Sequence, residues 1–278
     1  MMRGPNDIGL SVRRPDGVLE TTRKRVPPFY GGRLRKLPLF RGILVLLESL
    51  VLGTQALMYS AEKAGTGEDG EEMPKGLLLL TVAASLAFSV LLFFVAPLLI
   101  SRSLDALIAS DFVSNLLEGL VRMLIFVAYV ALIGLMPDIR RVFAYHGAEH
   151  RVINAFEAGV PLTPEAVRAY STSHARCGTS FIFVVLVVSI IVLSLLGRPV
   201  LWLSILTRIV LLPLIAAVSY EFIKWSADRQ CSPLVRALTS PGLQLQKLVT
   251  RQPDDAQVEA AIAALKAVLE EPAGAKAG

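Results

Sequence analysis

The sequence has 278 residues, of which 54% are hydrophobic and only 18% are charged, with a formal net charge of +5. The charged residues gather near the N-terminus, in the segment 138–180 and in the tail, and long uncharged runs separate them. This distribution is typical of a protein embedded in a bilayer and argues against a soluble domain. A basic surface suits anionic lipid, and because no basic patch is interleaved with aromatic residues, we expect no direct binding of nucleic acid.

The first 38 residues predict a small β-hairpin followed by a basic linker. Residues 8–12 and 18–22 have the composition of short strands, and they flank Pro15, Asp16 and Gly17. Gly17 is placed where a hairpin turn needs a positive φ. We therefore expect an antiparallel pair of strands at the N-terminus.

The segment 39–75 predicts an amphipathic helix and an acidic loop. Within residues 40–62 a polar residue recurs every seven positions, so one face of the helix carries a polar stripe, namely Arg41, Glu48, Gln55 and Glu62. A carboxylate such as Glu48 near the middle of a bilayer costs at least a few kcal/mol unless it is paired. We therefore expect this helix to be interfacial or re-entrant and not to span the membrane, with the acidic loop at 62–72 after it.

Four apolar stretches predict transmembrane helices, two within 76–137 and two within 179–222. They cover residues 76–100, 119–137, 179–197 and 199–220. The only charged residues in them are Arg122, whose side chain we expect to reach the end of its span, and Arg208, while Arg198 lies in the turn that joins the last two. With four spans, 24 of the 28 Lys and Arg residues share one side of the membrane. The positive-inside rule then predicts a multi-pass inner-membrane protein with both termini in the cytoplasm.

The remaining segments, 138–178 and 223–278, are predicted to be cytoplasmic. Thr163 and Pro164 have the pattern of a helix start, so 138–178 should form a helical hairpin. Asp254 and Asp255 should begin a last helix that ends before Pro272, and its apolar stripe needs the N-terminal hairpin or the 138–178 segment as a partner. Cys177 and Cys231 both fall in these cytoplasmic segments, so we expect free thiols. The fold class is a mainly α membrane protein: four transmembrane helices, an interfacial helix, a cytoplasmic helical hairpin and the N-terminal β-hairpin.

All three histidines of the chain, His146, His150 and His174, fall within 29 consecutive residues, and Cys177 follows them closely. His146 and His150 are spaced i, i+4, so they share one helical face and are close enough to bind one metal ion. Together with Glu149 they form H-x-x-E-H, the inverted zincin pattern, in which the glutamate is a general base. We expect zinc or another divalent metal here, with His174 as third ligand and Cys177 as a fourth ligand or a nearby thiol. Glu157 lies about 10 Å further along the helix, so we place it beside the ligands and not among them.

Three interpretations of this cluster stay open on the sequence alone. The histidines could only form hydrogen bonds that hold the segment against the membrane surface. They could form a closed structural zinc site with Cys177. They could bind a catalytic metal that keeps an open coordination position. For Cys177 itself, the pattern favours a buried thiol at the entrance of a span over a nucleophile.

The residues around this cluster resemble the YqhQ-type family of bacterial polytopic membrane proteins, whose domain has no known function. The resemblance rests on residues 137–150 (PDIRRVFAYHGAEH) and 176–181 (RCGTSF), and it extends to 41–53, 240–243 and 250–255. It implies a metal-dependent enzyme in which His146, Glu149 and His150 take part. Family members usually carry a further block ahead of the residues that match Met1, Met2 and Arg3, and this sequence begins after it.

Our leading expectation for function is a metal-dependent hydrolase that acts at the cytoplasmic face of the membrane on an unidentified substrate. The alternative is a non-enzymatic membrane factor in which the metal or the hydrogen-bonded histidines are structural. Such a factor would use its basic cytoplasmic surface to dock a ribosome, a translocon or another membrane assembly machine. Membrane lipid is an expected partner in both cases.

Overall fold

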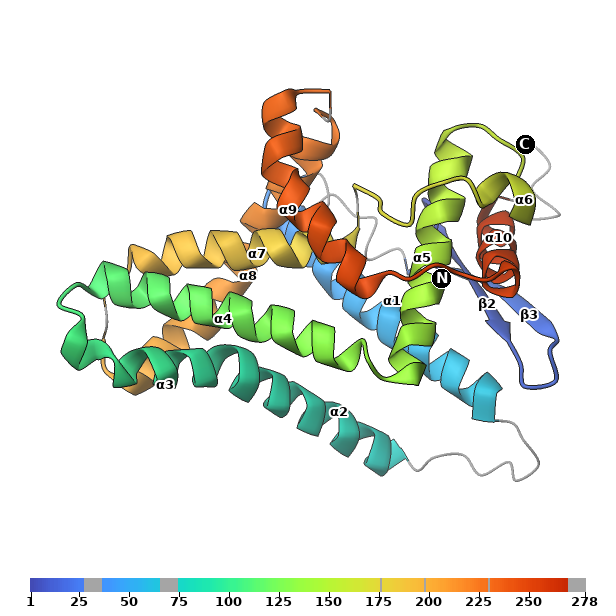
Figure 1. Ribbon diagram of the computed structural model, residues 1–278. Helices are drawn as coiled ribbons and strands as arrows, with labels where there is room; N and C mark the ends of the chain where they lie inside the picture. The colour runs from blue at the N-terminus through green and yellow to red at the C-terminus, as the bar shows by residue number, and fades with distance from the viewer. Residues whose placement is uncertain (28–36, 66–74, 176, 198, 230, 270–278) are drawn as a thin grey trace.

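A computed structural model describes residues 1–27, 37–65, 75–175, 177–197, 199–229 and 231–269. The part of the predicted linker at 28–36, most of the predicted acidic loop, Arg176 and Arg198 lie outside these described residues. The fold is mainly helical, with one small sheet, as the sequence predicts. Figure 1 shows most of the apolar helices on one side of the molecule and the sheet with helices α5 (Pro137–Glu157), α6 (Pro164–Val167) and α10 (Asp255–Leu269) on the other. The apolar helix α1 (Phe40–Gly65) extends from the first side to the second.

The N-terminal sheet is antiparallel and has three strands in the order β1-β2-β3. Strand β1 is Met2–Arg3, β2 is Asp7–Arg13 and β3 is Leu19–Arg25. The register pairs Leu10 with Thr22, and Gly17 takes a φ of 84° in the turn. The predicted hairpin is therefore confirmed, and a short strand before it completes the sheet.

The long apolar helices make this a membrane protein. Among the described residues, four helices are long and apolar enough to cross a bilayer, and they cover Phe40–Lys63, Leu80–Ser103, Asp111–Ile133 and Leu201–Ala227. The first belongs to α1 (Phe40–Gly65) and the second to α2 (Lys75–Val90), a π-helical turn η3 (Leu91–Val95) and α3 (Ala96–Ser103). The other two are α4 (Asp111–Ile133) and α8 (Leu201–Ala227), and α7 (Gly178–Ser194) is a shorter apolar helix beside them.

Helix α1 satisfies the length and composition of a span, although the sequence favours an interfacial placement. One face of α1 contacts the sheet, because Leu52 packs with Ile8 and Leu10. Glu48, only 3% exposed, accepts a hydrogen bond of 2.9 Å from Nε of Arg3, which supplies the partner that a buried carboxylate needs. A polar sheet along this helix favours a position at the membrane surface, and the interfacial placement stays a prediction.

Helix α4 carries the chain to the segment 138–178, close to where α5 begins. The predicted span 119–137 is shifted towards the N-terminus, because α4 ends at Ile133 and Pro137 is already the first residue of α5 (Pro137–Glu157). Proline suits that position because the first turn of a helix leaves its N–H unpaired. Figure 1 shows α5 running across the end of α4 and not along it.

The predicted helical hairpin is confirmed only in its first half. Thr163 caps α6, which spans only Pro164–Val167, and the chain from there to Ala175 is irregular. Side chains of α5 provide partners for the backbone of this returning segment. The amide of Asn154 donates to the carbonyls of Ser171 and Ser173 at 2.9 and 3.0 Å.

The tail forms α9 (Pro233–Val249) and α10 (Asp255–Leu269). The apolar stripe of α10 packs against both of the partners that the sequence offers. It forms one core with Met2 of the sheet and with α5 residues such as Ala148 and Val152. This core fixes α5 against the two ends of the chain, and α5 carries two of the three candidate histidines.

Candidate metal centre

Helix α5 places two histidine rings side by side. His146 and His150 are one turn apart, and their ring centroids are separated by 4.4 Å. His150 is only 5% exposed and His146 is partly buried. The i, i+4 spacing therefore produces the shared face that the sequence predicts.

Each of these rings is oriented by a backbone carbonyl from another part of the chain. Nδ1 of His146 lies 2.9 Å from the carbonyl oxygen of Val249, and Nδ1 of His150 lies 2.7 Å from that of Thr172. A carbonyl only accepts hydrogen bonds, so Nδ1 is the protonated nitrogen in both neutral rings. Nε2 of each neutral ring then keeps its lone pair, whereas both nitrogens of a protonated ring are donors.

Cys177 brings its sulfur to the same place. It is the N-cap of α7, and its Sγ lies 3.3 Å from Nε2 of His146. The backbone N–H of Thr179 donates to Sγ at 3.4 Å. One donor atom from each of His146, His150 and Cys177 lies within 4.8 Å of the other two, which is the spacing of ligands around one metal ion.

The electrostatics of the cluster favour a thiolate. Burial by itself raises the pKa of Cys177, but hydrogen bonds and charge from His146 and His150 outweigh it and lower the pKa to about 5. For His146, burial lowers the pKa, whereas the hydrogen bond and charge of Cys177 raise it more, so the pKa lies above the usual value. The thiolate is the form of cysteine that binds metals, and the fold stabilises this form near neutral pH.

His174 and Glu157 lie beside this group of three. The His174 ring centroid is 6.0 Å from that of His150, and its Nε2 faces Oε2 of Glu157 at 3.3 Å. The structure thus brings His146, His150 and Cys177 together as donors. It places the predicted third ligand, His174, next to them in contact with Glu157.

Glu149 points away from the shared face of the two histidines. Its side chain is 41% exposed, and its carboxylate lies 3.8 Å from the amino group of Met1. The charge of Glu149 still contributes to the raised pKa of His146, so the carboxylate acts on the cluster electrostatically.

Two residues that sequence reasoning missed position the cluster. Gln246 of α9 is fully buried, and its side-chain amide pairs with the backbone of His174: Oε1 accepts from N–H at 3.0 Å and Nε2 donates to C=O at 2.9 Å. Nε2 also donates to Ser180 at 2.7 Å, so Gln246 ties the segment before α7 to α7 itself. Gly147 allows the segment after α9 to lie close to α5, because a Cβ at this position would lie only 2.1 Å from the carbonyl oxygen of Arg251.

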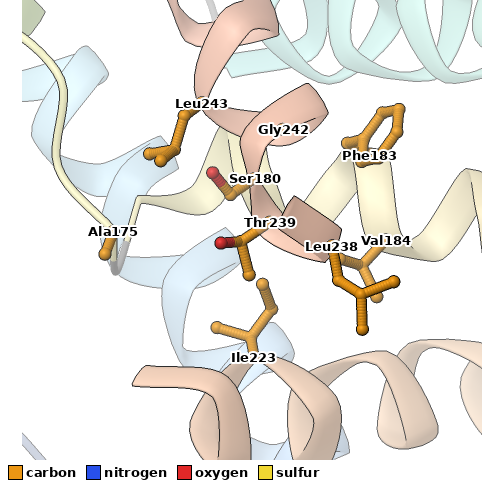
Figure 2. A pocket seen from close by; sticks show the side chains of 9 residues that line it. All are labelled: Ala175, Ser180, Phe183, Val184, Ile223, Leu238, Thr239, Gly242 and Leu243. Atoms are coloured by element: carbon orange, nitrogen blue, oxygen red, sulfur yellow. The ribbon is translucent and has the colours of Figure 1, made fainter. Parts of the chain in front are cut away.

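A small crevice lies between α7, α8 and α9. Figure 2 shows the hydroxyl groups of Ser180 and Thr239 directed towards the side where Ala175 lies, with apolar side chains around them. Its volume of about 10 Å³ is roughly the space of one water molecule, so the crevice is too small for an organic substrate.

A second polar cluster lies among the apolar helices, and it corrects an expectation. Arg122 does not reach the end of a span: it is 3% exposed, and it donates to Glu118 at 2.7 Å. Arg208 of α8 donates from Nε to the same carboxylate at 2.7 Å. The i, i+4 spacing of Glu118 and Arg122 was visible in the sequence, but no local pattern indicated that Arg208 joins them.

Comparisons with known proteins place the chain in a family. The family model described as "Protein of unknown function (DUF1385)" matches residues 37–271. The "Uncharacterized protein YqhQ" of Bacillus subtilis (strain 168) is 32% identical over 97% of this chain and 89% of its own length. No solved structure matches. The YqhQ-type resemblance is thereby confirmed, and the chain belongs to the DUF1385 family of proteins of unknown function.

Proposed function

We propose that this membrane protein is a metal-dependent hydrolase whose centre is formed by Nε2 of His146, Nε2 of His150 and Sγ of Cys177. Three protein ligands suit a zinc-type ion that keeps one position for water or substrate. Such an ion lowers the pKa of its bound water to about 7 and polarises a carbonyl or phosphoryl oxygen.

The observation that carries this proposal is the pair of hydrogen bonds behind the histidines. Metal-binding histidines usually donate their other ring nitrogen to a carbonyl or a carboxylate, which fixes the ring and its tautomer. Both rings do so here, towards Val249 and Thr172, and both Nε2 lone pairs are thereby left for a ligand role. The lowered pKa of Cys177 favours its thiolate, which adds the negative charge that a divalent cation favours.

We propose two groups that move protons near this centre. Glu149 is the general base that the H-x-x-E-H pattern indicates, and its carboxylate would have to turn from the amino group of Met1 to reach a water at the centre. The pair of His174 and Glu157 lies on the other side, next to His150. We propose Glu149 as the base and the His174–Glu157 pair as a group that orients water or substrate.

Metal analysis of the purified full-length protein tests the ligand set. Wild type should contain about one zinc-type ion per chain, because a tetrahedral site of this kind binds one ion. His150→Ala should lose most of it, whereas His174→Ala, the matched removal of a neighbouring imidazole, should keep it. A wild-type protein that contains no metal and takes up none on titration would refute the centre. Equal metal loss in both variants would indicate a closed site with His174 as a ligand.

The non-enzymatic alternative is supported by a different use of the same contacts. His146 binds the end of α9 and His150 binds the segment before α7, so the two rings hold three parts of the chain together without any metal. In that case the basic cytoplasmic surface would dock a ribosome, a translocon or another assembly machine.

Complementation of a deletion strain separates the two functions. If the protein is a hydrolase, Glu149→Gln should keep metal and folding but lose activity by roughly 10² to 10⁴, the usual contribution of a positioned base. Full complementation by Glu149→Gln, together with failure of His146→Ala, would instead favour a structural role for the cluster.

A further inference from the structure

An apolar groove runs between α4, α7 and α9, close to the candidate centre. Its volume is about 480 Å³, which falls within the range of roughly 300–1,000 Å³ found for ligand sites. Its walls include Phe126 and Val127 of α4, Leu186 of α7 and Leu248 of α9, and Gln244 is the one polar side chain among its lining residues. A groove of this composition suits a hydrocarbon chain.

The groove belongs to the part of the molecule that meets the bilayer. Helix α4 is long and apolar enough to cross a membrane, and α7 is an apolar helix beside it. On the same helix Leu124 is 68% exposed, so α4 presents apolar side chains outwards as well as into the groove. Hydrocarbon from lipid is therefore the medium into which this groove opens.

The chain connects one end of the groove to the residues that carry and orient the donor atoms. Leu248 lines the groove, and the next residue, Val249, accepts the hydrogen bond from Nδ1 of His146. On the opposite wall Phe183 follows Cys177 by six residues, which is about 9 Å along a helix. A chain lying in the groove would bring its polar end to His146 and Cys177.

Two basic residues lie within three positions of Leu248 along the chain. Lys247 and Arg251 are exposed and flank Leu248 in the sequence, Lys247 in the last turn of α9 and Arg251 just after it. Basic residues at a membrane surface attract anionic head groups, and each contributes about 1 kcal/mol. The charge and the groove together select an amphiphile with an anionic head and an apolar chain.

We propose that the groove binds one acyl chain of an anionic glycerophospholipid and places the ester and phosphate groups of this lipid at the candidate metal centre. The proposal rests on the proposed function for its chemistry, because it names the substrate class of that hydrolase. The binding itself depends on the groove and on the two basic residues, and not on the metal.

Photo-crosslinking in lipid nanodiscs tests the binding. The probe is phosphatidylglycerol with a diazirine in one acyl chain, and the crosslinked peptides are mapped by mass spectrometry. We expect labelling to be concentrated on the groove residues of α4 and α9. Val127→Trp should fill the groove and reduce this labelling several-fold, whereas Leu124→Trp, the same change on the exposed face of α4, should not.

The head group is tested with the same photoreactive chain on phosphatidylcholine. Phosphatidylglycerol should label the groove more strongly, and Lys247→Gln and Arg251→Gln should each reduce this preference by about fivefold. Labelling spread evenly over the exposed apolar helices, or equal for both lipids, would show only bulk lipid and overturn the proposal.

Metal analysis on the same samples keeps the two proposals apart. His146→Ala should lose the metal but keep the groove labelling, because it leaves all groove residues in place. A metal-free wild type that is still labelled in the groove would refute the hydrolase and the substrate role, and leave a lipid-binding site. A metal-loaded wild type without selective labelling would refute the lipid proposal alone.

Discussion

Gly147 offers a sharp test of how the centre is held, because two effects of adding a methyl group have opposite signs. In a helix interior, Ala is normally more stabilising than Gly by about 1 kcal/mol. At Gly147, however, the new Cβ would lie 2.1 Å from the carbonyl oxygen of Arg251 and 3.3 Å from its carbonyl carbon. These are backbone atoms, so no side-chain rotation relieves the contact.

The contact requires the segment at 249–251 to move away from α5 by about 1 Å or more, given optimal non-bonded separations of roughly 3.5 Å. Two hydrogen bonds would then stretch: the 2.9 Å bond from the Arg251 N–H to the Phe143 carbonyl, and the 2.9 Å bond between Nδ1 of His146 and the Val249 carbonyl. Overpacking costs about 1–3 kcal/mol, and each lost bond about 0.5–1.5 kcal/mol. We expect Gly147→Ala to be destabilising by about 1–5 kcal/mol after the gain in helix propensity, and to bind metal more weakly.

Gly53→Ala is the matched control. Gly53 lies inside α1, and a Cβ there meets nothing within 4 Å, so this variant should be neutral or stabilising by up to about 1 kcal/mol. The assays are thermal unfolding in detergent and metal content of the purified protein. If Gly147→Ala unfolds at the same temperature as Gly53→Ala and binds as much metal as wild type, the close approach does not position the centre.

Three further predictions concern charge and topology. Glu118→Gln should lower the free energy of unfolding by about 3–5 kcal/mol, because it leaves the buried Arg122 and Arg208 without their carboxylate. Thermal unfolding measures this change, and an unchanged midpoint would refute the buried pairing. In metal-free protein the thiolate absorbance of Cys177 should appear with a midpoint near pH 5, because histidine contacts lower its pKa. The lowered pKa adds stability to the folded protein that is complete above about pH 9 and is lost as the pH falls through about 5. A midpoint near pH 9 would contradict the contact with His146. Reporter fusions at positions 160 and 278 should report the cytoplasm and fusions at 110 and 198 the outside, and an outside signal at 160 would reverse the predicted orientation.

The parts of the fold that local patterns encode were predictable. The strands around Gly17, the cap at Thr163 and the apolar stripe of α10 each depend on neighbours within a few residues. The i, i+4 pair of His146 and His150 is of the same kind, so the sequence located the candidate centre and two of its donors.

The parts that depend on distant partners were not predictable in the same way. The segment after α6 is irregular because its carbonyls are bound by Asn154 and His150, and no local pattern reveals such pairing. Whether Cys177 or His174 becomes the third donor beside His146 and His150 depends on how Gln246 holds the segment that carries both candidates. Arg208 joins Glu118 across 90 positions, which only the packing of α4 and α8 determines.

The five residues from His146 to His150 show why the site and the fold are difficult to separate in this protein. The two histidines point to Cys177, Gly147 admits the carbonyl of Arg251, and Ala148 is fully buried in the core with α10. Glu149 alone is turned towards the N-terminus and remains partly exposed. Substitution of Gly147 or Ala148 must therefore weaken the centre through packing, even though neither side chain approaches a donor atom. Glu149 is the one position in the block where chemistry can be changed while the packing is kept, and for this reason Glu149→Gln is the variant that best separates a hydrolase from a structural factor.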